Sequence, residues 1–200
     1  MQRFILLDMT GCKVEAVARG STVSCFNDVL KEGCTYTMHR VIFKRISDDG
    51  KFRNIGNTYE CSFVENTMAV PFTLPIQFPP YPKHLMPFSQ VFRRPDKTFV
   101  DIARIIVHWG ELEHIGTYPN QRHYREIILM DDRSNMLTVG IWSEHLRQHA
   151  ISLPTAAVDK QIIIGTMLKN NYKHGCFETS SYTKFAFKPI HHATSELQGF

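Results

Sequence analysis

One pattern of predicted elements occurs twice in this chain of 200 residues. The first copy runs from Phe4 to Val64 and the second from Arg125 to Pro189, offset by about 123 residues. In each copy, short apolar runs bounded by Gly, Asp and Asn predict strands, and a helical stretch follows the second strand. Repetition at this length indicates two successive folded units of the same architecture.

The order of elements within each copy is strand, tight turn, strand, helix, strand, loop, strand. A helix that interrupts a small antiparallel meander favours a closed barrel, and the five-stranded OB barrel has this order. We therefore predict an all-β fold with short helices, built as two tandem OB-fold barrels.

The two copies differ in what precedes their shared first strand. The second copy has an additional predicted strand, 99–109, and a loop, 110–123, whereas the first has only residues 1–3 at the equivalent place. The first barrel is therefore expected to lack its first strand, which leaves two strand edges unpaired. The linker or a strand from a partner would fill this gap, or the gene model is truncated.

Prolines separate the two copies. They recur through residues 71–87 at a density that neither a helix nor a central strand tolerates, so this stretch predicts an extended linker. Its apolar residues, such as Phe72 and Leu74, indicate that it lies against one or both barrels. The predicted parts are a first, incomplete OB domain (1–70), the linker (71–97), a second OB domain (98–190) and a disordered tail (191–200).

The composition is typical of a soluble intracellular protein. Hydrophobic residues make up 43% of the chain, too many for a disordered one, and we find neither a membrane-spanning stretch nor a cleavable signal. The five cysteines include no Cys-x-x-Cys pair, so reduced thiols are expected. His145 and His149 share one face of a predicted helix but lack the rest of a zinc motif, which favours a solvated helix face.

Sequence motifs of enzymes are absent. There is no Gly-rich phosphate loop, no Gly-x-Ser-x-Gly turn and no His-Glu-x-x-His helix. The acidic pair Asp131-Asp132 can bind a metal in principle, but it lies in a predicted turn, where Asp is favoured for its backbone hydrogen bonds. We therefore expect a binding protein with no cofactor and no metal, and not an enzyme.

Short motifs along nearly the whole chain resemble one known family. They are Leu7-Asp8-Met9-Thr10-Gly11, Val14-Glu15-Ala16-Val17, Leu30-Lys31-Glu32-Gly33-Cys34-Thr35-Tyr36, Asn57-Thr58-Tyr59-Glu60, Phe99-Val100-Asp101-Ile102, Ile128-Leu129-Met130-Asp131 and Val139-Gly140-Ile141-Trp142-Ser143-Glu144. In order and spacing they resemble the two tandem central DNA-binding OB domains of the replication protein A large subunit. The Leu-Lys-Glu-Gly motif looks most like the plant members of this family, which is expanded in plants. The match would be to a truncated member, without the family's amino-terminal interaction domain or its zinc-bearing trimerisation domain.

This resemblance implies single-stranded DNA binding in the nucleus, in DNA replication, repair or recombination. It also implies other replication protein A subunits or repair proteins as partners, although heterotrimer assembly does not follow from two OB domains alone. No membrane partner is expected. The net charge of +4 permits nucleic-acid binding without demonstrating it, because clustering of the charges on one face decides the matter.

Two aromatic residues of the second unit are candidates for base stacking. An OB groove stacks bases on aromatic rings, worth about 1 to 3 kcal/mol per base, while Lys and Arg follow the phosphates. Trp142 ends a predicted strand, where core and surface positions are equally common, and Tyr172 lies in a polar turn, where a buried ring is unexpected. The resemblance places both at the family's stacking positions.

Four cations of the second unit are candidate phosphate contacts. Lys169 and Lys173 flank Tyr172 in the turn. Arg122 and Arg125 end the loop before the Ile127 strand, where they line the other side of the groove or are simply solvated.

The first unit fits the family less completely. Phe52, in its predicted basic turn, fits the second stacking position, unless this turn is only a solvated hairpin. The other stacking position holds Arg19, whose guanidinium can stack on a base or pair with a phosphate. Glu15 lies where a family member can carry a basic groove residue, which weakens the case for tight binding. The candidate cations of this turn are Lys44, Lys51 and Arg53.

Two functions of different classes therefore remain. The first is a single-stranded DNA-binding module that uses the aromatic and basic residues above. The second is an OB-type interaction scaffold that kept the fold but lost most DNA affinity, as the missing strand, Arg19 and Glu15 suggest. Steep weakening of DNA binding with rising salt distinguishes the first from the second.

Overall fold

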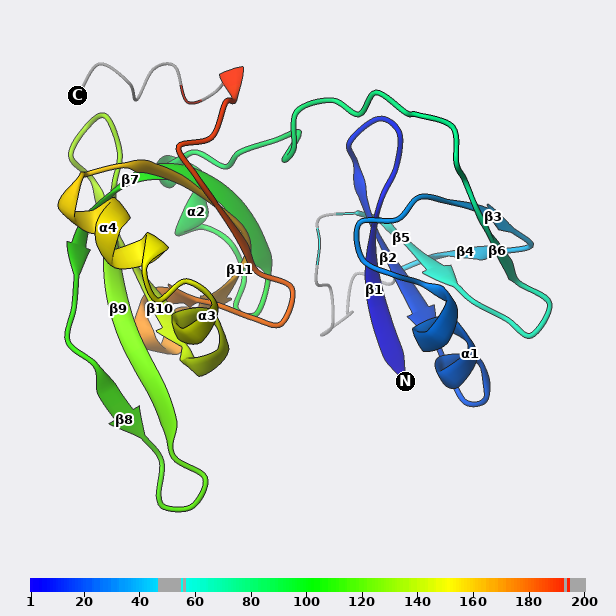
Figure 1. The fold of residues 1–200 in the computed structure, drawn as a ribbon, viewed down its shortest axis with the longest axis horizontal. Helices are drawn as coiled ribbons and strands as arrows, with labels where there is room; N and C mark the ends of the chain where they lie inside the picture. The colour runs from blue at the N-terminus through cyan, green and yellow to red at the C-terminus, as the bar shows by residue number, and fades with distance from the viewer. Residues whose placement is uncertain (47–54, 56, 193, 195–200) are drawn as a thin grey trace. The chain divides into compact units, whose positions relative to one another are not determined.

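The computed structural model describes residues 1–46, 55, 57–192 and 194, which form a mostly β structure with short helices. The chain divides into two compact units, Met1–Lys83 and His84–Phe200, each with its own hydrophobic core (Figure 1). None of the helices in the described ranges combines the length and the apolar character that crossing a bilayer requires.

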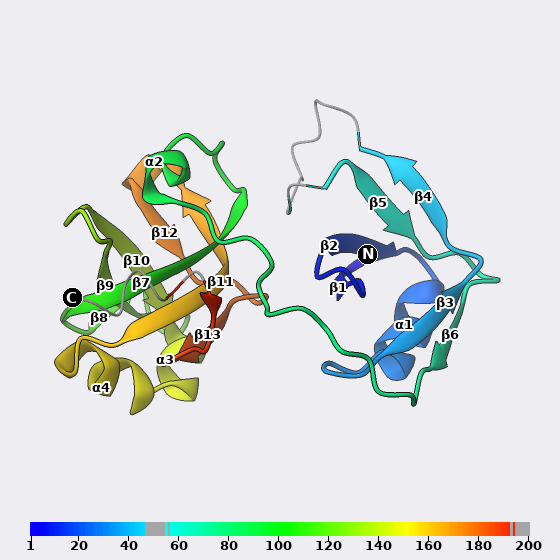
Figure 2. The same cartoon turned by 90° about the horizontal axis from the view of Figure 1, so that it is seen from above.

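The second unit is a closed barrel with helices packed around it. Figure 2 shows α3 and α4 together on one side of this barrel and α2 on another. Its strands are β7 (Phe99–Trp109), β8 (Glu113–Ile115), β9 (Arg122–Met130), β10 (Met136–Trp142), β11 (Ile162–Asn171), β12 (Cys176–Glu178) and β13 (Lys184–Phe187). Its helices are α2 (Phe88–Val91), α3 (Ser143–Gln148), α4 (Ser152–Val158) and a 3-10 turn at Tyr172–His174.

The strand pairings close this barrel. β7 pairs with β9, β9 with β10, β10 with β12 in parallel, β12 with β11, and β11 with β7 again. The last element of the second copy, expected as one strand, is instead two, β12 and β13. Both pair with β11, and they are separated by a turn in which the Thr183 amide donates to the Ser180 carbonyl. A five-stranded barrel in this order is the OB fold, so the predicted fold class is confirmed.

Alternating strand residues fill the barrel with branched side chains. Because side chains alternate between the faces of a strand, every second residue of β9 and β10 points inward. The buried core is Phe88, Val91, Val100, Ile102, Ile106, Ile127, Leu129, Leu137, Val139, Ile141, Leu153, Ala156, Ile163, Leu168 and Phe177.

The first unit has the same order of elements but breaks its later strands. The strand expected after the helix is split into two at Arg40, whose φ of 56° takes the backbone out of the extended region. Its elements are β1 (Gln2–Leu7), β2 (Lys13–Ala18), α1 (Thr22–Val29), β3 (Tyr36–His39), β4 (Ile42–Arg45), β5 (Tyr59–Ser62) and β6 (Met68–Pro71). They form a sheet of order β1-β2-β5-β4 and a separate β3-β6 pair.

The two units share their strand register. Leu7 pairs with Lys13 at the end of the β1–β2 ladder, as Met130 pairs with Met136 at the end of the β9–β10 ladder. The second copy of the repeat is therefore structurally equivalent to the first over these strands.

An acidic side chain closes the turn of each ladder. The carboxylate of Asp8 accepts hydrogen bonds from the amides of Thr10 and Cys12, both at 2.9 Å, and that of Asp131 accepts from the amides of Arg133 and Asn135 at 3.0 and 2.8 Å. The bond from the Thr10 hydroxyl leads the interactions that lower the pKa of Asp8. Burial alone would raise the pKa of Asp131, but its hydrogen bonds outweigh burial and the pKa lies below the ordinary value. Asp131 therefore has the turn role predicted for it.

The first unit lacks a counterpart of β7 among the described residues, as predicted. β1 and β4 are the two edges of its sheet there. Phe4 and Leu6 are only half-buried, whereas the equivalent Ile127 and Leu129 in the closed barrel are 0% and 1% exposed.

The proline-rich segment lies against the first unit up to Lys83. The Lys83 ammonium is 3.6 Å from the Cys12 sulfur, and the Lys13 ammonium is 5.3 Å from the centre of the Tyr81 ring. A Cβ on Gly11 would lie 2.8 Å from the Pro79 side chain, so the absence of a side chain at Gly11 leaves room for the proline-rich segment. Within the described ranges, this segment does not pair with β1 or β4 and so does not fill the open strand position.

The segment from residue 84 onward belongs to the second unit. Phe88 and Val91 of α2 are part of its core. Of residues 191–200, only 191, 192 and 194 are described, and His191 and Thr194 are buried. The prediction of a disordered tail otherwise lies outside the described residues.

The paired histidines of α3 do not form a solvated face, contrary to prediction. His145 is 6% exposed, its Nε2 lies 2.8 Å from the Ser180 carbonyl oxygen, and its ring stacks at 6.3 Å on His149. Phe185 contacts both rings edge-on. In the described part of the chain, no three His, Cys, Asp or Glu side chains are placed to hold a metal ion, and all five cysteines are free.

The half-buried His149 should make stability depend on pH. Burial, reinforced by His145 and Lys184, lowers the pKa of His149. The unfolded chain therefore takes up a proton below about pH 6.5 that the folded chain resists, and stability falls as pH drops through that value. Urea unfolding at pH 7.5 and 5.5 should show this loss, and His149→Gln should reduce it while His39→Gln, at an exposed position of β3, does not. Equal pH dependence in all three proteins would contradict the prediction.

Candidate nucleic-acid interface

One outer face of the second barrel collects the aromatic candidates. Because directly paired residues share a face, Tyr124 of β9 and Trp142 of β10 lie together on the side opposite the core residues Ile127 and Ile141. In OB folds this face, flanked by the loop after the first strand and the loop between the last two, is where oligonucleotides bind. The flanking loops here are residues 110–121 and 172–175.

Trp142 forms a cluster with two neighbouring side chains, Tyr124 and Arg122. The Tyr124 ring is 4.8 Å away at an interplanar angle of 57°, and the Arg122 guanidinium carbon is 4.5 Å from the centre of the Trp142 ring. Trp142 is half-buried, and its amide donates to the Thr179 hydroxyl at 2.9 Å, which fixes the strand end. A base that reaches this ring either displaces Arg122 or stacks on its guanidinium plane, which is itself a good stacking surface.

Tyr124 is a site residue that the sequence analysis missed. It packs directly over Gly140, where an added Cβ would lie 2.5 Å from the ring. Its hydroxyl donates to Glu126 at 3.1 Å, and burial raises its pKa, so it remains protonated. The signal was the alternation of Tyr124, Glu126 and Ile128 along one strand, which puts the tyrosine on the same face as Trp142.

Tyr172 lies at the other end of the same face. It is 71% exposed in the turn that joins β11 to β12, and its amide donates to Asp96 at 3.0 Å. β12 runs parallel to β10, with Phe177 paired to Val139. The turn that precedes β12 therefore lies near Thr138, which precedes Val139. Thr138 and Trp142 are four positions apart on β10, a span of roughly 13 Å.

The predicted cations do not all gather on this face. Lys173 is exposed beside Tyr172, and Lys169 shares the outer face because it pairs with Glu178. Arg125 instead lies on the other side of β9 from Tyr124, and its guanidinium carbon is 4.5 Å from the centre of the Trp109 ring. Arg122 is on the face but packs against Trp142.

Two carboxylates occupy the middle of the face. Gly140 pairs with Glu126 on one side and with Glu178 on the other. Glu178 accepts a hydrogen bond from the Asn171 side-chain amide at 2.7 Å. Carboxylates can accept hydrogen bonds from base amino groups but repel phosphates, so a bound strand would have to keep its phosphates away from this centre.

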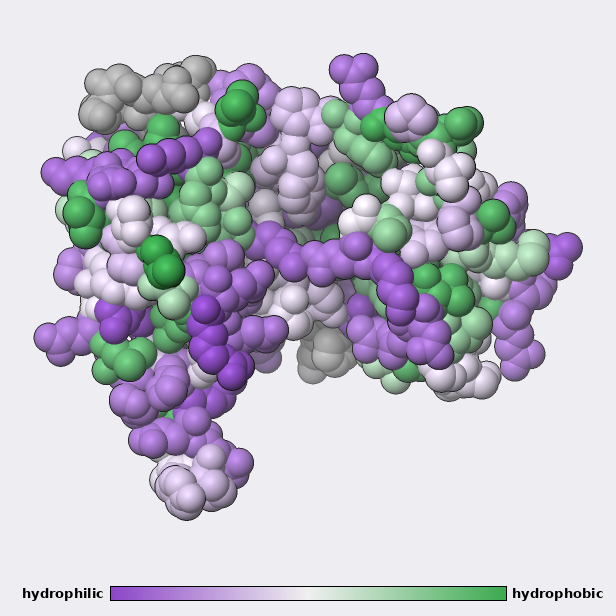
Figure 3. Space-filling view, viewed as in Figure 1, coloured by the Kyte–Doolittle hydropathy of each residue, from purple (hydrophilic) through white to green (hydrophobic). Residues whose placement is uncertain are grey.

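A β-hairpin arm extends from one edge of the face. It consists of β8 and the start of β9, with His114 and His123 in edge contact at 4.8 Å, and Tyr118 near its tip is 92% exposed. Figure 1 shows the arm projecting from the barrel, and Figure 3, in the same view, shows it as mostly hydrophilic. The arm contributes Arg122 to the stack on Trp142.

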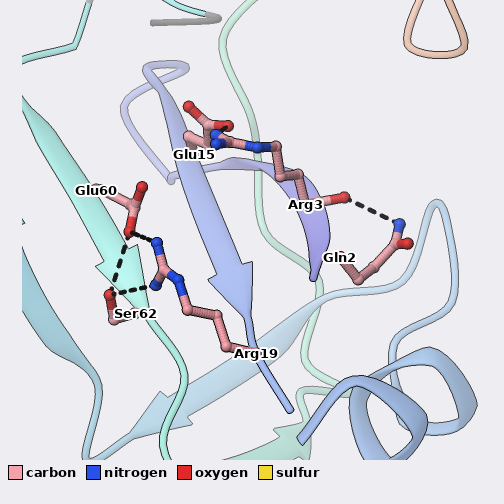
Figure 4. Close-up of polar contacts among 6 residues, drawn as sticks. All are labelled: Gln2, Arg3, Glu15, Arg19, Glu60 and Ser62. Carbon is pink, nitrogen blue, oxygen red and sulfur yellow. Dashed lines mark hydrogen bonds and ion pairs between the residues drawn. The ribbon is translucent and has the colours of Figure 1, made fainter. Parts of the chain in front are cut away.

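In the first unit, described residues of the equivalent face form ion pairs (Figure 4). Arg19 follows β2 where Trp142 ends β10, and its guanidinium is 3.0 Å from Glu60 and 3.5 Å from the Ser62 hydroxyl. Arg3 pairs with Glu15, which is 1% exposed. The charges of both arginines are thus offset by carboxylates of the same unit.

The remaining candidates of the first unit are only partly described. Lys44 is exposed on β4. Phe52, Lys51 and Arg53 lie outside the described residues, so a second stacking position in this unit remains a prediction.

A family model matches part of the second unit. A family model described as a domain of unknown function (DUF8448) matches residues 86–178, which span α2 to β12 and so include all five strands of the closed barrel. The comparison with curated proteins finds no match.

Two solved structures are similar to the chain. A chain from a replication protein A heterotrimer bound to ssDNA is similar with a TM-score of 0.56 and 18% identity over 94% of this chain, which spans 43% of its length. A deletion mutant of the single-stranded DNA binding protein from Thermus aquaticus has a TM-score of 0.25 and 12% identity, with 96% of this chain and 82% of that one covered. The first likeness shows a shared fold, and the second is too distant to add to it.

The contact between Tyr124 and Gly140 should be sensitive to one methyl group. Gly140→Ala places a Cβ 2.5 Å from the edge of the Tyr124 ring and from its hydroxyl, so we expect a loss of about 1 to 3 kcal/mol in the free energy of unfolding. In a Tyr124→Leu background the same change should cost less, because the clashing atoms are gone. Denaturant titrations of the four proteins measure the coupling. Equal costs in both backgrounds would show that the ring does not pack there in solution.

Proposed function

We propose that this protein binds single-stranded DNA along the outer face of its second unit. The observation that carries this proposal is the Arg122–Trp142–Tyr124 cluster at one end of that face, with the exposed ring of Tyr172 at the other. Rings at both ends of an OB ligand face suit a single strand, because every base has a face that can stack.

The spacing of the rings suggests how a strand would lie. Roughly 13 Å along β10 corresponds to roughly four stacked bases at about 3.4 Å each. Arg122 and Lys173 lie at the two ends, where they can contact phosphates, and the carboxylates of Glu126 and Glu178 lie between them under the bases. This arrangement accounts for a mixed rather than purely basic face.

The cellular role that we propose is in DNA replication, repair or recombination, in the nucleus. It is supported by the motifs that resemble the replication protein A large subunit and by the fold shared with a chain of such a heterotrimer. Other replication protein A subunits or repair proteins are the partners that fit this role. The protein would act by binding, with no catalytic step.

The first unit supports a second candidate function, that of an interaction scaffold. Its ligand face holds Arg3 and Arg19 in ion pairs, and it lacks a ring at the position of Trp142 among the described residues. We therefore propose that the second unit dominates DNA affinity.

A fluorescence-anisotropy titration with labelled oligo-dT tests the main proposal. At low salt we expect saturable binding that weakens steeply as salt rises. Trp142→Ala and Tyr172→Ala should each raise Kd by roughly 5- to 150-fold, the equivalent of one lost stacked base. Val158→Ala, at a position 81% exposed on α4, is the matched control and should bind like the unaltered protein.

Two results would contradict the proposal. Absence of binding by folded protein at low salt would favour the scaffold function. Binding that both aromatic substitutions leave unchanged would place the DNA elsewhere on the chain.

The Arg19–Glu60 pair yields a separate prediction. Glu60→Ala removes a negative charge and releases Arg19, so oligo-dT should bind more tightly, by several-fold at low salt. The effect should persist in the Trp142→Ala background, since it arises in the other unit. Glu65→Ala, which removes an exposed carboxylate from the same unit, is the control for net charge. An equal gain from Glu65→Ala would show that only overall charge matters.

A further inference from the structure

The first unit leaves one strand position of its barrel open. β1 and β4 are sheet edges, and β3 pairs only with β6, within the part of the chain that the structure describes. In the second unit, β7 takes the equivalent position and pairs antiparallel with both β9 and β11. The second unit therefore serves as a template, since β7 shows what kind of strand could occupy the open position of the first unit.

Core-facing side chains around the open position are uncovered. Phe43 pairs with Cys61, which is 2% exposed, so Phe43 points to the core side of the sheet, yet 60% of it is exposed. At the equivalent place in the second unit, Asn170 pairs with Phe177 and is only 5% exposed. The segment just before β7 covers Asn170 there, through hydrogen bonds from its side-chain amide to the carbonyls of residues 94 and 95.

The template defines the chemistry of a suitable occupant. Val100, Ile102 and Ile106 of β7 point into the closed core, so an occupant needs apolar side chains on one face. On β4 the exposed Lys44 lies on the face opposite Phe43 and favours acidic side chains on the outer face of the occupant, whereas the exposed Arg45 shares the side of Phe43. We propose that an extended segment of a partner protein, apolar on one face and acidic on the other, adds as a strand between β1 and β3–β4.

Charge argues against a second copy of this chain as the occupant. Edge-to-edge pairing of two copies would bring Lys44 and Arg45 of one copy close to the same residues of the other, which is unfavourable. β7, which has the required apolar pattern, is already held inside its own barrel by pairs on both sides. A strand from another protein supplies main-chain hydrogen bonds to both open edges, the mode known as β-strand addition.

A peptide derived from β7 tests this proposal on the full chain. The probe is a peptide with the sequence of residues 99–109, in which Ala103→Glu adds an acid on the face opposite Val100 and Ile102, and the control peptide carries Pro in place of Ile102 and Ile106. Hydrogen exchange followed by mass spectrometry should show added amide protection in residues 2–7 and 42–45 with the probe alone. Residues 122–130 should keep their protection, because the second barrel is already closed.

A surface variant locates the binding independently. Phe43→Lys replaces an exposed ring, so the unit should stay folded, and we expect at least a tenfold rise in the Kd of the labelled probe. Val29→Lys, at an exposed position of α1, should bind the probe like the unaltered protein.

Three outcomes would overturn the proposal. One is absence of protection at β1 and β4, or equal protection by both peptides. Another is a change confined to residues 122–130, which would mean strand exchange in the second barrel. The third is a free chain that sediments as a dimer with β1 already protected, which would make a second copy the occupant.

Discussion

The antiparallel pairing of β7 with both β9 and β11 is the constraint on which the second unit depends. It converts a curled sheet into a barrel without edges, and it covers Ile127 and Leu129 completely. The β9–β10 ladder, whose inner residues this closure buries, also brings Tyr124 beside Trp142 on the outer face.

The first unit shows the same sheet without this pairing. β1 and β2 keep the register of β9 and β10, and Asp8 closes their turn as Asp131 does in the second unit. Closure is therefore not required for the meander itself. What differs is burial, because the core positions near the open edge remain partly exposed. On the outer face, Arg19 in its ion pair with Glu60 stands where the closed barrel has Trp142.

Much of the fold could be predicted because it is encoded locally. Alternating apolar residues, the paired Asp turns and the repeat itself fixed the order of strands, and the absence of a first strand followed from counting. The breaks within strands could not be predicted, since the split at Arg40 depends on a positive φ that no nearby residue type demands. The burial of His145 was also missed, because it depends on Ser180 and Phe185, which lie far along the chain.

The candidate site was predictable only in part. Trp142 and Tyr172 lie on or beside the expected face, but Arg125 turns to Trp109 because strand alternation places it on the other side. Arg19 was expected to meet a base or a phosphate, whereas it meets Glu60, a residue 41 positions away that only the parallel β2–β5 pairing brings close. Cross-strand partners decide these cases, and a single sequence does not reveal them.

The closeness of Tyr124 and Trp142 has an optical consequence. With ring centres 4.8 Å apart, energy absorbed by the tyrosine passes to the indole, so emission from this pair comes from one tryptophan whose other neighbour is the Arg122 guanidinium. The protein has only one other tryptophan, Trp109, and it also contacts an arginine. The outer face of the second unit therefore contains its own fluorophore, and any ligand that moves Arg122 changes the light that the unlabelled protein emits.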